Sequence, residues 1–378
     1  MTEDPLVGLL ADLVAIPSMN PMGRARAGAE YSEAALAGHV ADYLRRHAID
    51  VELQEVAPGR PNVIAHIDAG AAKTLLLEAH LDTVYADGMS FPPFTPAVRD
   101  GRLYGRGSCD TKGSLAAFLH AAVTCAAARK SMRYNVVLAA VADEEYKFTG
   151  ATHAVAKGLR ADMGIAGEPT RLRIVRAHKG VTRWKIVTTG VSAHAAYPDR
   201  GENAIYAMGG VLARLERYAA ALQNSAGHPL LGPPTLSVGV IEGGQAVNVV
   251  PDRCVIEIDR RTLPGESTDA VLAAVQKTLE GVAGWRFEPP HLIAPPMETP
   301  AESPVVGELS DAIRRITGSV TFEAAPYATD AGVYGSAGIP SVVFGPGDIA
   351  QAHTADEWIE IDELQRASKI IMALLSMH

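Results

Sequence analysis

Histidine and acidic residues repeatedly follow apolar stretches of this 378-residue chain, which places groups able to bind metals or move protons at expected strand ends. The first pair is His80 and Asp82, which directly follow the run Thr-Leu-Leu-Leu-Glu-Ala at residues 74–79. Side chains two residues apart in a strand point the same way. His80 could therefore bind a metal through one ring nitrogen while Asp82 accepts a hydrogen bond from the other. Taken alone, the pair also fits a solvated surface contact.

A glycine-rich turn carries the next acidic residue. The stretch Gly105-Arg-Gly-Ser-Cys-Asp110-Thr-Lys-Gly113 precedes an alanine-rich segment of helical character. It lacks the G-x-x-x-x-G-K-[ST] pattern of a phosphate-binding loop, and a carboxylate within such a loop would repel phosphate. Asp110 is better explained as a metal ligand presented by a tight turn. Its neighbour Cys109 is interpreted as a small packing residue rather than a catalytic thiol.

Two adjacent glutamates follow another apolar run, residues 135–142, in the sequence Asp143-Glu144-Glu145. Neighbouring residues in a regular strand face opposite sides, so these glutamates can share a site only where the strand has ended. Two carboxylates at such a point can have distinct tasks, because one can bind a metal while the other moves protons.

Glu168 and His353 complete the set. Glu168 stands in Ile-Ala-Gly-Glu-Pro-Thr at another expected strand end, and His353 lies in a loop after the last apolar run. Parallel sheets place their ligand crevice at such strand ends. Two histidines with three or four carboxylates are too many ligands for one tetrahedral zinc ion. They suit two metal ions that share a bridging carboxylate.

Composition argues against several classes of protein. The chain has 34 Lys and Arg against 43 Asp and Glu, a formal net charge of −9 without a long basic run, which disfavours a nucleic-acid partner. The acidic N-terminus does not resemble a secretory signal, and no stretch has the roughly 18 apolar residues of a membrane span. Three cysteines without C-x-x-C spacing fit a reducing compartment. We therefore expect a cytoplasmic protein without a membrane partner.

The elements that must position these residues alternate between strands and helices. A helix should begin at Pro5, capped by Asp4, and stop before Pro17. Further helices are expected at residues 34–47 and 114–129, and strands at 51–56, 62–67, 74–79 and 135–142. Nearly continuous apolar strands are typical of a sheet covered on both faces. This order predicts an α/β fold with a mostly parallel central sheet flanked by helices.

The pattern changes from about residue 177. Strands at 181–188, 235–241 and 254–259 and helices at 203–222 and 268–282 give the order β-α-β-β-α, which is typical of a small α+β sandwich. A proline-rich stretch at 289–300 marks its end. A helix at 303–316, a strand at 340–344 and a helix at 362–377 follow. We predict a catalytic domain formed by residues 1–176 and 291–378, with a small domain, 177–290, inserted into it.

The order of the motifs resembles metallopeptidase family M20, which includes acetylornithine deacetylase, succinyl-diaminopimelate desuccinylase, aminoacylase and the glutamate carboxypeptidases. The resemblance extends over almost the whole chain. It rests on L-V-x-I-P-S at residues 13–18, H-x-D at 80–82, G-R-G-x-x-D-x-K-G at 105–113, D-E-E at 143–145, G-E-P-T at 167–170 and A-H-x-x-D-E at 352–357. It implies a zinc-exopeptidase-like fold and two zinc ions, which cobalt or manganese could replace.

The resemblance also implies a role for each residue of the cluster. One zinc ion would be bound by His80 and Glu168 and the other by Glu145 and His353. Asp110 would bridge the two ions, and its peptide bond to Thr111 would be cis. The remaining acidic residues would be Glu144 as general base and acid, and Asp82 as the residue that orients His80.

For the inserted segment, the resemblance implies a lid and a homodimer interface. His194, in Gly-Val-Ser-Ala-His-Ala, matches a histidine thought to polarise the scissile carbonyl, often from the partner subunit. Asn248 and either Arg260 or Arg261 resemble contacts to a substrate carboxylate, which an arginine can bind with two parallel donors. Strand alternation lets only one of the two arginines face the site. The loop at 327–330 is expected nearby, without an assigned role.

The implied reaction is removal of the acyl group from a small N-acyl amino acid, as in acetylornithine deacetylase or succinyl-diaminopimelate desuccinylase. Glu rather than Asp at position 168 resembles the deacylase and glutamate-carboxypeptidase branches, so an exopeptidase of the latter kind is the alternative. A catalytically inactive, metal-dependent small-molecule binding protein is an alternative of another class. The presence of Glu144 and a full ligand set speaks against it.

Overall fold

The computed structural model describes residues 4–26 and 28–377 of the chain. It divides into two compact units, which we call the large unit (Met1–Arg176, Glu298–Glu323 and Thr329–His378) and the small unit (Ala177–Met297 and Ala324–Ala328). The small unit extends past residue 290, the end expected for the inserted domain. The reason is that β15 (Leu292–Ala294) still pairs with β9 (Gly180–Thr189) of that unit.

The sheet of the large unit is parallel at its centre and antiparallel towards its edges. The central strands β6, β3, β7 and β18 pair in parallel, whereas β1 and β2 at one edge are antiparallel. Beyond β18 the order continues with β8 and β16, and β17 pairs with β8. The strands are β1 (Val51–Ala57), β2 (Arg60–Ile67), β3 (Thr74–His80), β6 (Asn135–Val141), β7 (Met163–Ala166), β8 (Ile174–His178), β16 (Met297–Glu298), β17 (Phe322–Ala325) and β18 (Ser341–Val343).

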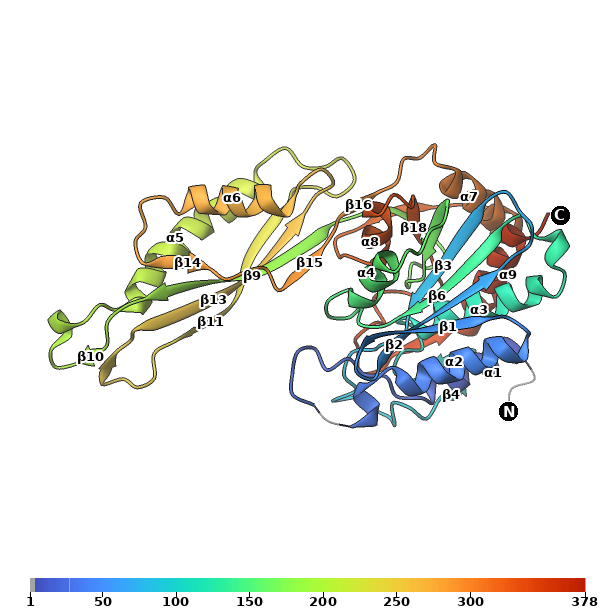
Figure 1. Cartoon of the computed structure of the whole chain (residues 1–378), viewed down its shortest axis with the longest axis horizontal. Coiled ribbons are helices and arrows are strands. Elements are labelled where there is room, and N and C mark those ends of the chain that lie inside the picture. Colours follow the sequence, from blue (N-terminus) through green and yellow to red (C-terminus); the bar gives the residue numbers. More distant parts are fainter. Residues whose placement is uncertain (1–3, 27, 378) are drawn as a thin grey trace. The chain divides into compact units, whose positions relative to one another are not determined.

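Helices cover both faces of this sheet, which confirms the predicted fold class. Alternate strand residues such as Leu75, Leu77 and Leu138 join the core under one set of helices. This set is α1 (Pro5–Val14), α2 (Ala34–Arg46), α3 (Lys112–Ala126), α7 (Pro304–Thr317) and α9 (Ile361–Leu375). On the opposite side of the sheet from α3 and α9 lie α4 (Thr149–Ala156) and α8 (Asp330–Ser336) (Figure 1). As predicted, Asp4 caps α1, accepting a hydrogen bond from the Leu6 N–H at 2.9 Å.

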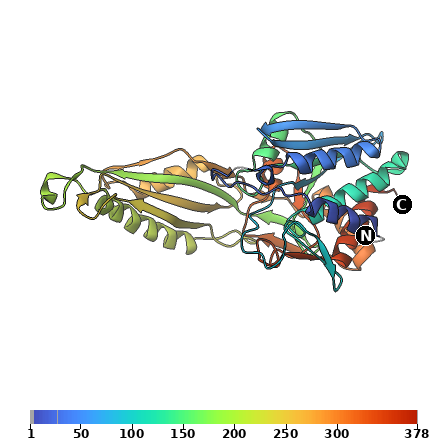
Figure 2. The ribbon, with the colours of Figure 1, turned by 90° about the horizontal axis from the view of Figure 1, so that it is seen from below.

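The small unit is an antiparallel sheet with two helices on one face. The strand order is β11 (Thr235–Gly243), β13 (Arg253–Thr262), β9 and β14 (Trp285–Phe287), with β15 also beside β9. The helices α5 (Ala204–Gln223) and α6 (Thr268–Thr278) pack on it around Trp184, Ile186 and Ile256 (Figures 1 and 2). This is the α+β sandwich that the β-α-β-β-α order predicted.

A small sheet that the sequence did not predict joins two distant segments of the large unit. Its strands are β4 (Ala97–Arg99), β5 (Arg102–Tyr104) and β19 (Trp358–Glu360), with β5 in the middle. Three-residue strands are too short to show a hydrophobic period. The pairing of Trp358 with Tyr104 brings the loop of His353 beside the loop of Asp110.

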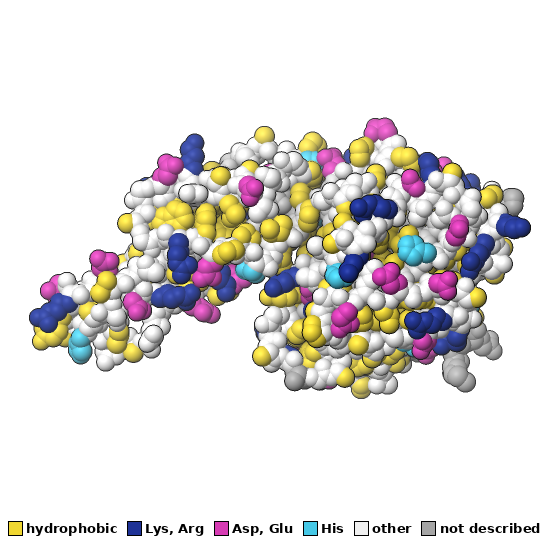
Figure 3. All heavy atoms as spheres, in the orientation of Figure 1, with side chains coloured by type: hydrophobic (Ala, Val, Ile, Leu, Met, Phe, Trp, Pro, Cys, Tyr) yellow, Lys and Arg dark blue, Asp and Glu magenta, His cyan; other side chains and the backbone are white. Residues whose placement is uncertain are grey.

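Two features of the described residues concern the partners considered above, which are nucleic acid and membrane. Lys and Arg side chains on the face drawn in Figure 3 are scattered among Asp and Glu rather than gathered into one basic area. Across residues 4–26 and 28–377, no helix combines the length and apolar character required to cross a membrane.

The close approach at Gly190 generates a test of the small unit. A Cβ atom at this position would collide with the main-chain oxygen of Glu202, whereas a Cβ at Gly239 would meet open space. Overpacking of this kind typically costs about 1–3 kcal/mol. We expect Gly190→Ala to lower the free energy of unfolding in urea by about that amount and Gly239→Ala to change it by less than about 0.5 kcal/mol. Equal stability of the two variants would contradict the packing described.

Candidate metal centre and active site

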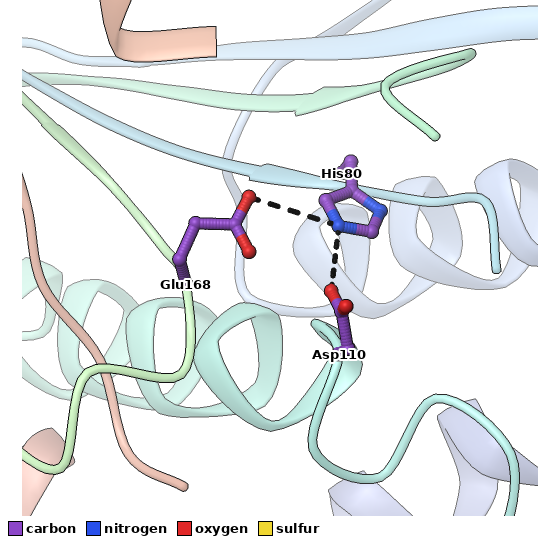
Figure 4. Close-up of side chains that lie close together, drawn as sticks. All are labelled: His80, Asp110 and Glu168. Atoms are coloured by element: carbon purple, nitrogen blue, oxygen red, sulfur yellow. Dashed lines mark hydrogen bonds and ion pairs between the residues drawn. The ribbon is translucent and has the colours of Figure 1, made fainter. Parts of the chain in front are cut away.

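Three elements of the large unit bring His80, Asp110 and Glu168 together (Figure 4). His80 is the last residue of β3, Asp110 stands just before α3, and Glu168 follows β7. The His80 Nε2 atom lies 3.0 Å from Asp110 Oδ1 and 3.8 Å from Glu168 Oε1. All three side chains are buried, and their ligand atoms lie within 4.8 Å of one another, close enough to hold one metal ion.

A second group consists of Asp110, Glu145 and His353. The His353 Nε2 atom lies 3.2 Å from Asp110 Oδ2 and 3.1 Å from Glu145 Oε2. Thus each oxygen of Asp110 faces a different histidine. The two groups differ in access to solvent, because the side chain of His353 is 52% exposed while that of His80 is 1% exposed. The Asp110–Thr111 peptide is cis, as the resemblance implied.

The electrostatics of these residues fit cationic occupants. Burial, followed by the charge of Asp110, raises the pKa of Glu168 well above its usual range. The same two causes raise the pKa of Glu145 to about 7. Both shifts mean that the ionised carboxylates lack sufficient positive charge around them. Divalent ions bound by these oxygen and nitrogen donors would supply that charge.

Ring orientation at His80 also suits a metal ligand. Its Nδ1 donates a hydrogen bond to the main-chain oxygen of Asp82 at 2.9 Å, which leaves the Nε2 lone pair directed towards Asp110 and Glu168. The expected partner was the Asp82 carboxylate, whose Oδ1 lies 3.6 Å from Nδ1. The carboxylate instead accepts hydrogen bonds from the main-chain N–H groups of Glu144 and Glu145, both at 3.1 Å. Asp82 therefore fixes the loop of the two glutamates as well as the histidine.

Glu144 lies beside the first group without belonging to it. Its Oε2 atom is 4.0 Å from His80 Nε2, and its side chain is only 11% exposed. Burial, followed by the neighbouring charge of Glu168, raises the pKa of the Glu144 carboxyl well above its usual range. Its position beside the metal ligands suits a carboxyl group that takes up a proton and gives one back.

A buried polar network behind these residues could not be predicted from the sequence. The Asn20 amide donates hydrogen bonds to Asp82 Oδ2 at 2.7 Å and Asp143 Oδ1 at 2.9 Å. Arg60 donates to the same Asp143 oxygen at 2.8 Å and forms an ion pair with the buried Glu33. Asp143 adopts a positive φ of 66°. No local pattern marks these residues, because their partners lie 27 to 123 positions away along the chain.

The loop at 327–330, left without a role, contributes one more acid to the same region. Asp330 is the first residue of α8 and is 1% exposed. Burial raises the pKa of its carboxyl to about 7, while the proximity of His80 lowers it. The side chain of Glu78 is also buried. Burial, followed by the neighbouring charge of Asp330, raises the pKa of the Glu78 carboxyl well above its usual range. Asp330 thus adds to the negative charge around His80.

The structure places His194 and Asn248 next to each other within the small unit. His194 ends β10 (Ala193–His194), which pairs with β12 (Val249–Val250). The Ala195 N–H donates to the main-chain oxygen of Asn248 at 3.0 Å. Both residues are exposed, so their side chains are available to a ligand.

The two arginines of β13 point to opposite faces of the small-unit sheet. Arg260 is 1% exposed, on the face of Ile256 and Ile258, and donates to Glu266 at 2.6 Å. Arg261 is on the other face, with its side chain 29% exposed, and donates to Asp259 at 2.7 Å. Strand alternation therefore separates the two arginines as expected.

Comparisons with known proteins identify the family of the chain. A model of the family described as peptidase family M20/M25/M40 matches residues 76–377. The chain belongs to this family. The acetylornithine deacetylase of Myxococcus xanthus is 35% identical to it over 307 residues, which are 79% of this chain and 78% of that protein. Membership of the M20 family confirms the predicted resemblance and makes the chain a hydrolase of amide bonds.

Two solved structures share the fold. One is the M20 family metallo-carboxypeptidase Sso-CP2 from Sulfolobus solfataricus, with a TM-score of 0.80 and 21% identity over 98% of each chain. The other is a dinuclear metal binding peptidase of the M20 family from Bacillus subtilis. Its TM-score is 0.70 at 19% identity, over 98% of this chain and 96% of that one. At such identities the likeness establishes the M20 architecture and not the substrate.

The Asn20 network generates a test of the metal centre. Asn20→Ala would leave the Asp82 and Asp143 carboxylates without the amide that joins them. Loss of a residue that orients metal ligands typically lowers metal affinity about 10–100-fold, and we expect a loss in that range. Zinc titration of the metal-depleted protein against a competing chelator would measure it.

Asn135→Ala is the matched control, because Asn135 also makes several hydrogen bonds to the main chain, with Ala69 and Ala71 at the other end of β6. It should leave zinc affinity unchanged. Equal affinities of the Asn20 and Asn135 variants would show that the network does not support the metal ligands.

Proposed function

We propose that the chain is a dinuclear zinc amidohydrolase that removes the acyl group from a small N-acyl amino acid. One zinc ion would be held by His80 and Glu168 and the other by Glu145 and His353, with Asp110 contributing to both groups. The observation that carries the proposal is the placement of the two Asp110 oxygens, at 3.0 Å from His80 Nε2 and 3.2 Å from His353 Nε2. The dinuclear Bacillus subtilis relative supports the stoichiometry.

The metal identity follows from the donor atoms. Imidazole nitrogen and carboxylate oxygen suit zinc, and the same set accepts cobalt or manganese. When bound, such ions act as Lewis acids that polarise a carbonyl oxygen and lower the pKa of water.

The proton transfers are assigned to Glu144. Its carboxylate takes a proton from the attacking water and later donates that proton to the leaving amine. Its burial beside His80 and outside the two ligand groups leaves this carboxyl free to transfer the proton in both steps. Asp82 holds Glu144 in place by accepting a hydrogen bond from its main-chain N–H.

The substrate class is inferred from the acetylornithine deacetylase relative and from a cationic face of the small unit. Asp259 accepts hydrogen bonds from both Arg183 and Arg261, at 2.8 Å and 2.7 Å. Lys179 is near Arg261, since burial and then the charges of Arg260 and Arg261 lower the pKa of its amine. One carboxylate therefore serves two guanidinium groups, and positive charge is in excess. We assign Arg261 to the substrate carboxylate, because Arg260 is buried against Glu266.

His194 and Asn248 are proposed as further substrate contacts. The pairing of β10 with β12 and the exposure of both residues suit a pair that binds one ligand. The His194 ring would polarise the scissile carbonyl and the Asn248 amide would bind a polar substrate group.

A homodimer through the small unit is the proposed assembly. β11 lies at the edge of the small-unit sheet and exposes Val240 and Ile241, at 46% and 54%. On α5, Ile205 and Tyr206 are 40% and 81% exposed. An edge strand with apolar side chains favours pairing with another chain. The small unit would then serve as both lid and interface.

The free thiols of Cys109, Cys125 and Cys254 agree with a cytoplasmic location.

Substitution of Glu144 tests the proton-transfer assignment. Glu144→Gln should lower kcat by about 10²–10⁴-fold, because an amide cannot accept the proton of the attacking water. Two zinc ions per chain should remain bound, as measured by atomic emission. Glu145→Gln is the matched control and should lose zinc together with activity. Wild-type kcat in the Glu144 variant would refute the assignment.

A side-by-side substrate comparison tests the proposed reaction. The zinc-loaded enzyme is offered N-acetylornithine, N-succinyl-diaminopimelate and a folate-like acylglutamate, and release of free amine is measured before and after treatment with a chelator. We expect the highest kcat/KM with an N-acyl amino acid and loss of turnover after chelation. Preference for the acylglutamate would indicate a glutamate carboxypeptidase-like exopeptidase instead. Absence of turnover with two metals bound would indicate a binding protein.

A further inference from the structure

Glu357 is a buried acidic residue that none of the roles above uses. It lies four positions after His353 in the large unit and is 0% exposed. Each of its carboxylate oxygens accepts two hydrogen bonds from the turn that carries Asp110. Oε1 accepts from the N–H groups of Cys109 and Asp110, both at 3.0 Å, and Oε2 accepts from the Gly107 N–H at 2.9 Å and Arg106 Nη1 at 2.7 Å.

Both oxygens of Glu357 are therefore occupied by protein donors. This distinguishes it from the carboxylates of the two metal groups, whose oxygens face histidine nitrogens. Glu357 acts on the main chain at Asp110 itself rather than on a metal ion. Charge-assisted hydrogen bonds of this kind are roughly twice as strong as neutral ones.

Arg106 extends the same contact to the loop of His353. While Nη1 binds Glu357, its Nη2 donates to the main-chain oxygen of Thr354 at 3.1 Å. The Gly105 N–H also donates to the Glu357 main-chain oxygen at 3.2 Å, next to the pairing of β5 with β19. The buried Glu357–Arg106 ion pair and the hydrogen bonds on either side of it thus join the loop of Asp110 to the loop of His353.

We propose that Glu357, together with Arg106, is a positioning residue that fixes Asp110 and His353 relative to each other and thereby sets the affinity for metal at the Asp110–Glu145–His353 group. The inference rests on the proposed dinuclear function. Its physical basis is that two ligands of this group lie on loops joined by the Glu357–Arg106 pair, while the third, Glu145, is held separately by Asp82.

A carboxylate is required at position 357 because four donors surround it. Glutamine offers one acceptor oxygen and an NH₂ group, so Glu357→Gln turns two hydrogen bonds into contacts between donors. The matched control is Glu360→Gln. Glu360 lies on β19 and pairs with Arg102 at 2.9 Å, but both side chains are about 40% exposed, at 42% and 39%. The two substitutions remove the same charge, and only one of them touches the loop of Asp110.

The experiment measures cobalt binding to the full-length metal-depleted protein by chelator competition, together with the visible absorption spectrum of the cobalt-loaded form. Glu357→Gln should weaken the binding of one of the two cobalt ions by about 10–100-fold and alter the cobalt spectrum, as loss of a ligand-orienting group does. Glu360→Gln should match the wild type in both. If Glu357→Gln fails to fold, Arg106→Lys, which keeps the charge but loses the planar fork to Thr354, should weaken the same site.

The results separate this inference from the proposed function. A lowered unfolding temperature with wild-type cobalt affinity and spectrum, in Glu357→Gln or in Arg106→Lys, would overturn the positioning role. A wild-type protein that binds fewer than two cobalt ions would instead overturn the dinuclear function on which it rests.

Discussion

The two oxygens of Asp110 lie between two histidines that are 273 positions apart in the sequence, and the rest of the site is arranged around that contact. Gathering Asp110 with Glu144, Glu145 and Glu168 in a buried space is unfavourable, since like charges repel strongly where water is excluded. The raised pKa values of Glu144 and Glu168 express this cost. Divalent cations on either side of Asp110 would offset it, which explains why a fold would retain so many buried acids together.

The parallel strands bring the site residues that follow them close together. The ends of β3, β6 and β7 meet at one edge of the sheet, so His80, the Glu144–Glu145 pair and Glu168 converge there without any of them being close in sequence. Buried polar contacts then fix the loops that carry these residues. Asp82 and Asn20 hold the glutamate loop, and hydrogen bonds to buried charged groups of this kind are costly to break. A stiff frame therefore surrounds groups that would otherwise repel one another.

The sequence predicted the strands and the residues at their ends because both leave local signals. The apolar run before His80 and the Asp-Glu-Glu motif after residue 142 are examples, since each can be recognised within about ten residues. The roles of Asn20 and Arg60 could not be predicted in this way, because their partners are brought near only by the folded sheet. The contact of the His80 ring with Asp82 differs in detail from the prediction, since the main-chain oxygen of Asp82 accepts the hydrogen bond at 2.9 Å and its carboxylate lies 3.6 Å away. The two arginines of β13 show the same limit, since alternation predicts opposite faces but only packing against Glu266 identifies the buried one.

The most direct test of the account is anomalous X-ray diffraction at the zinc absorption edge from crystals of the zinc-loaded protein. We expect two peaks per chain, one on each side of Asp110, each about 2.0–2.2 Å from a different Asp110 oxygen. One peak would be near His80 and Glu168 and the other near Glu145 and His353. A single peak, or two peaks that do not share Asp110, would contradict the dinuclear centre.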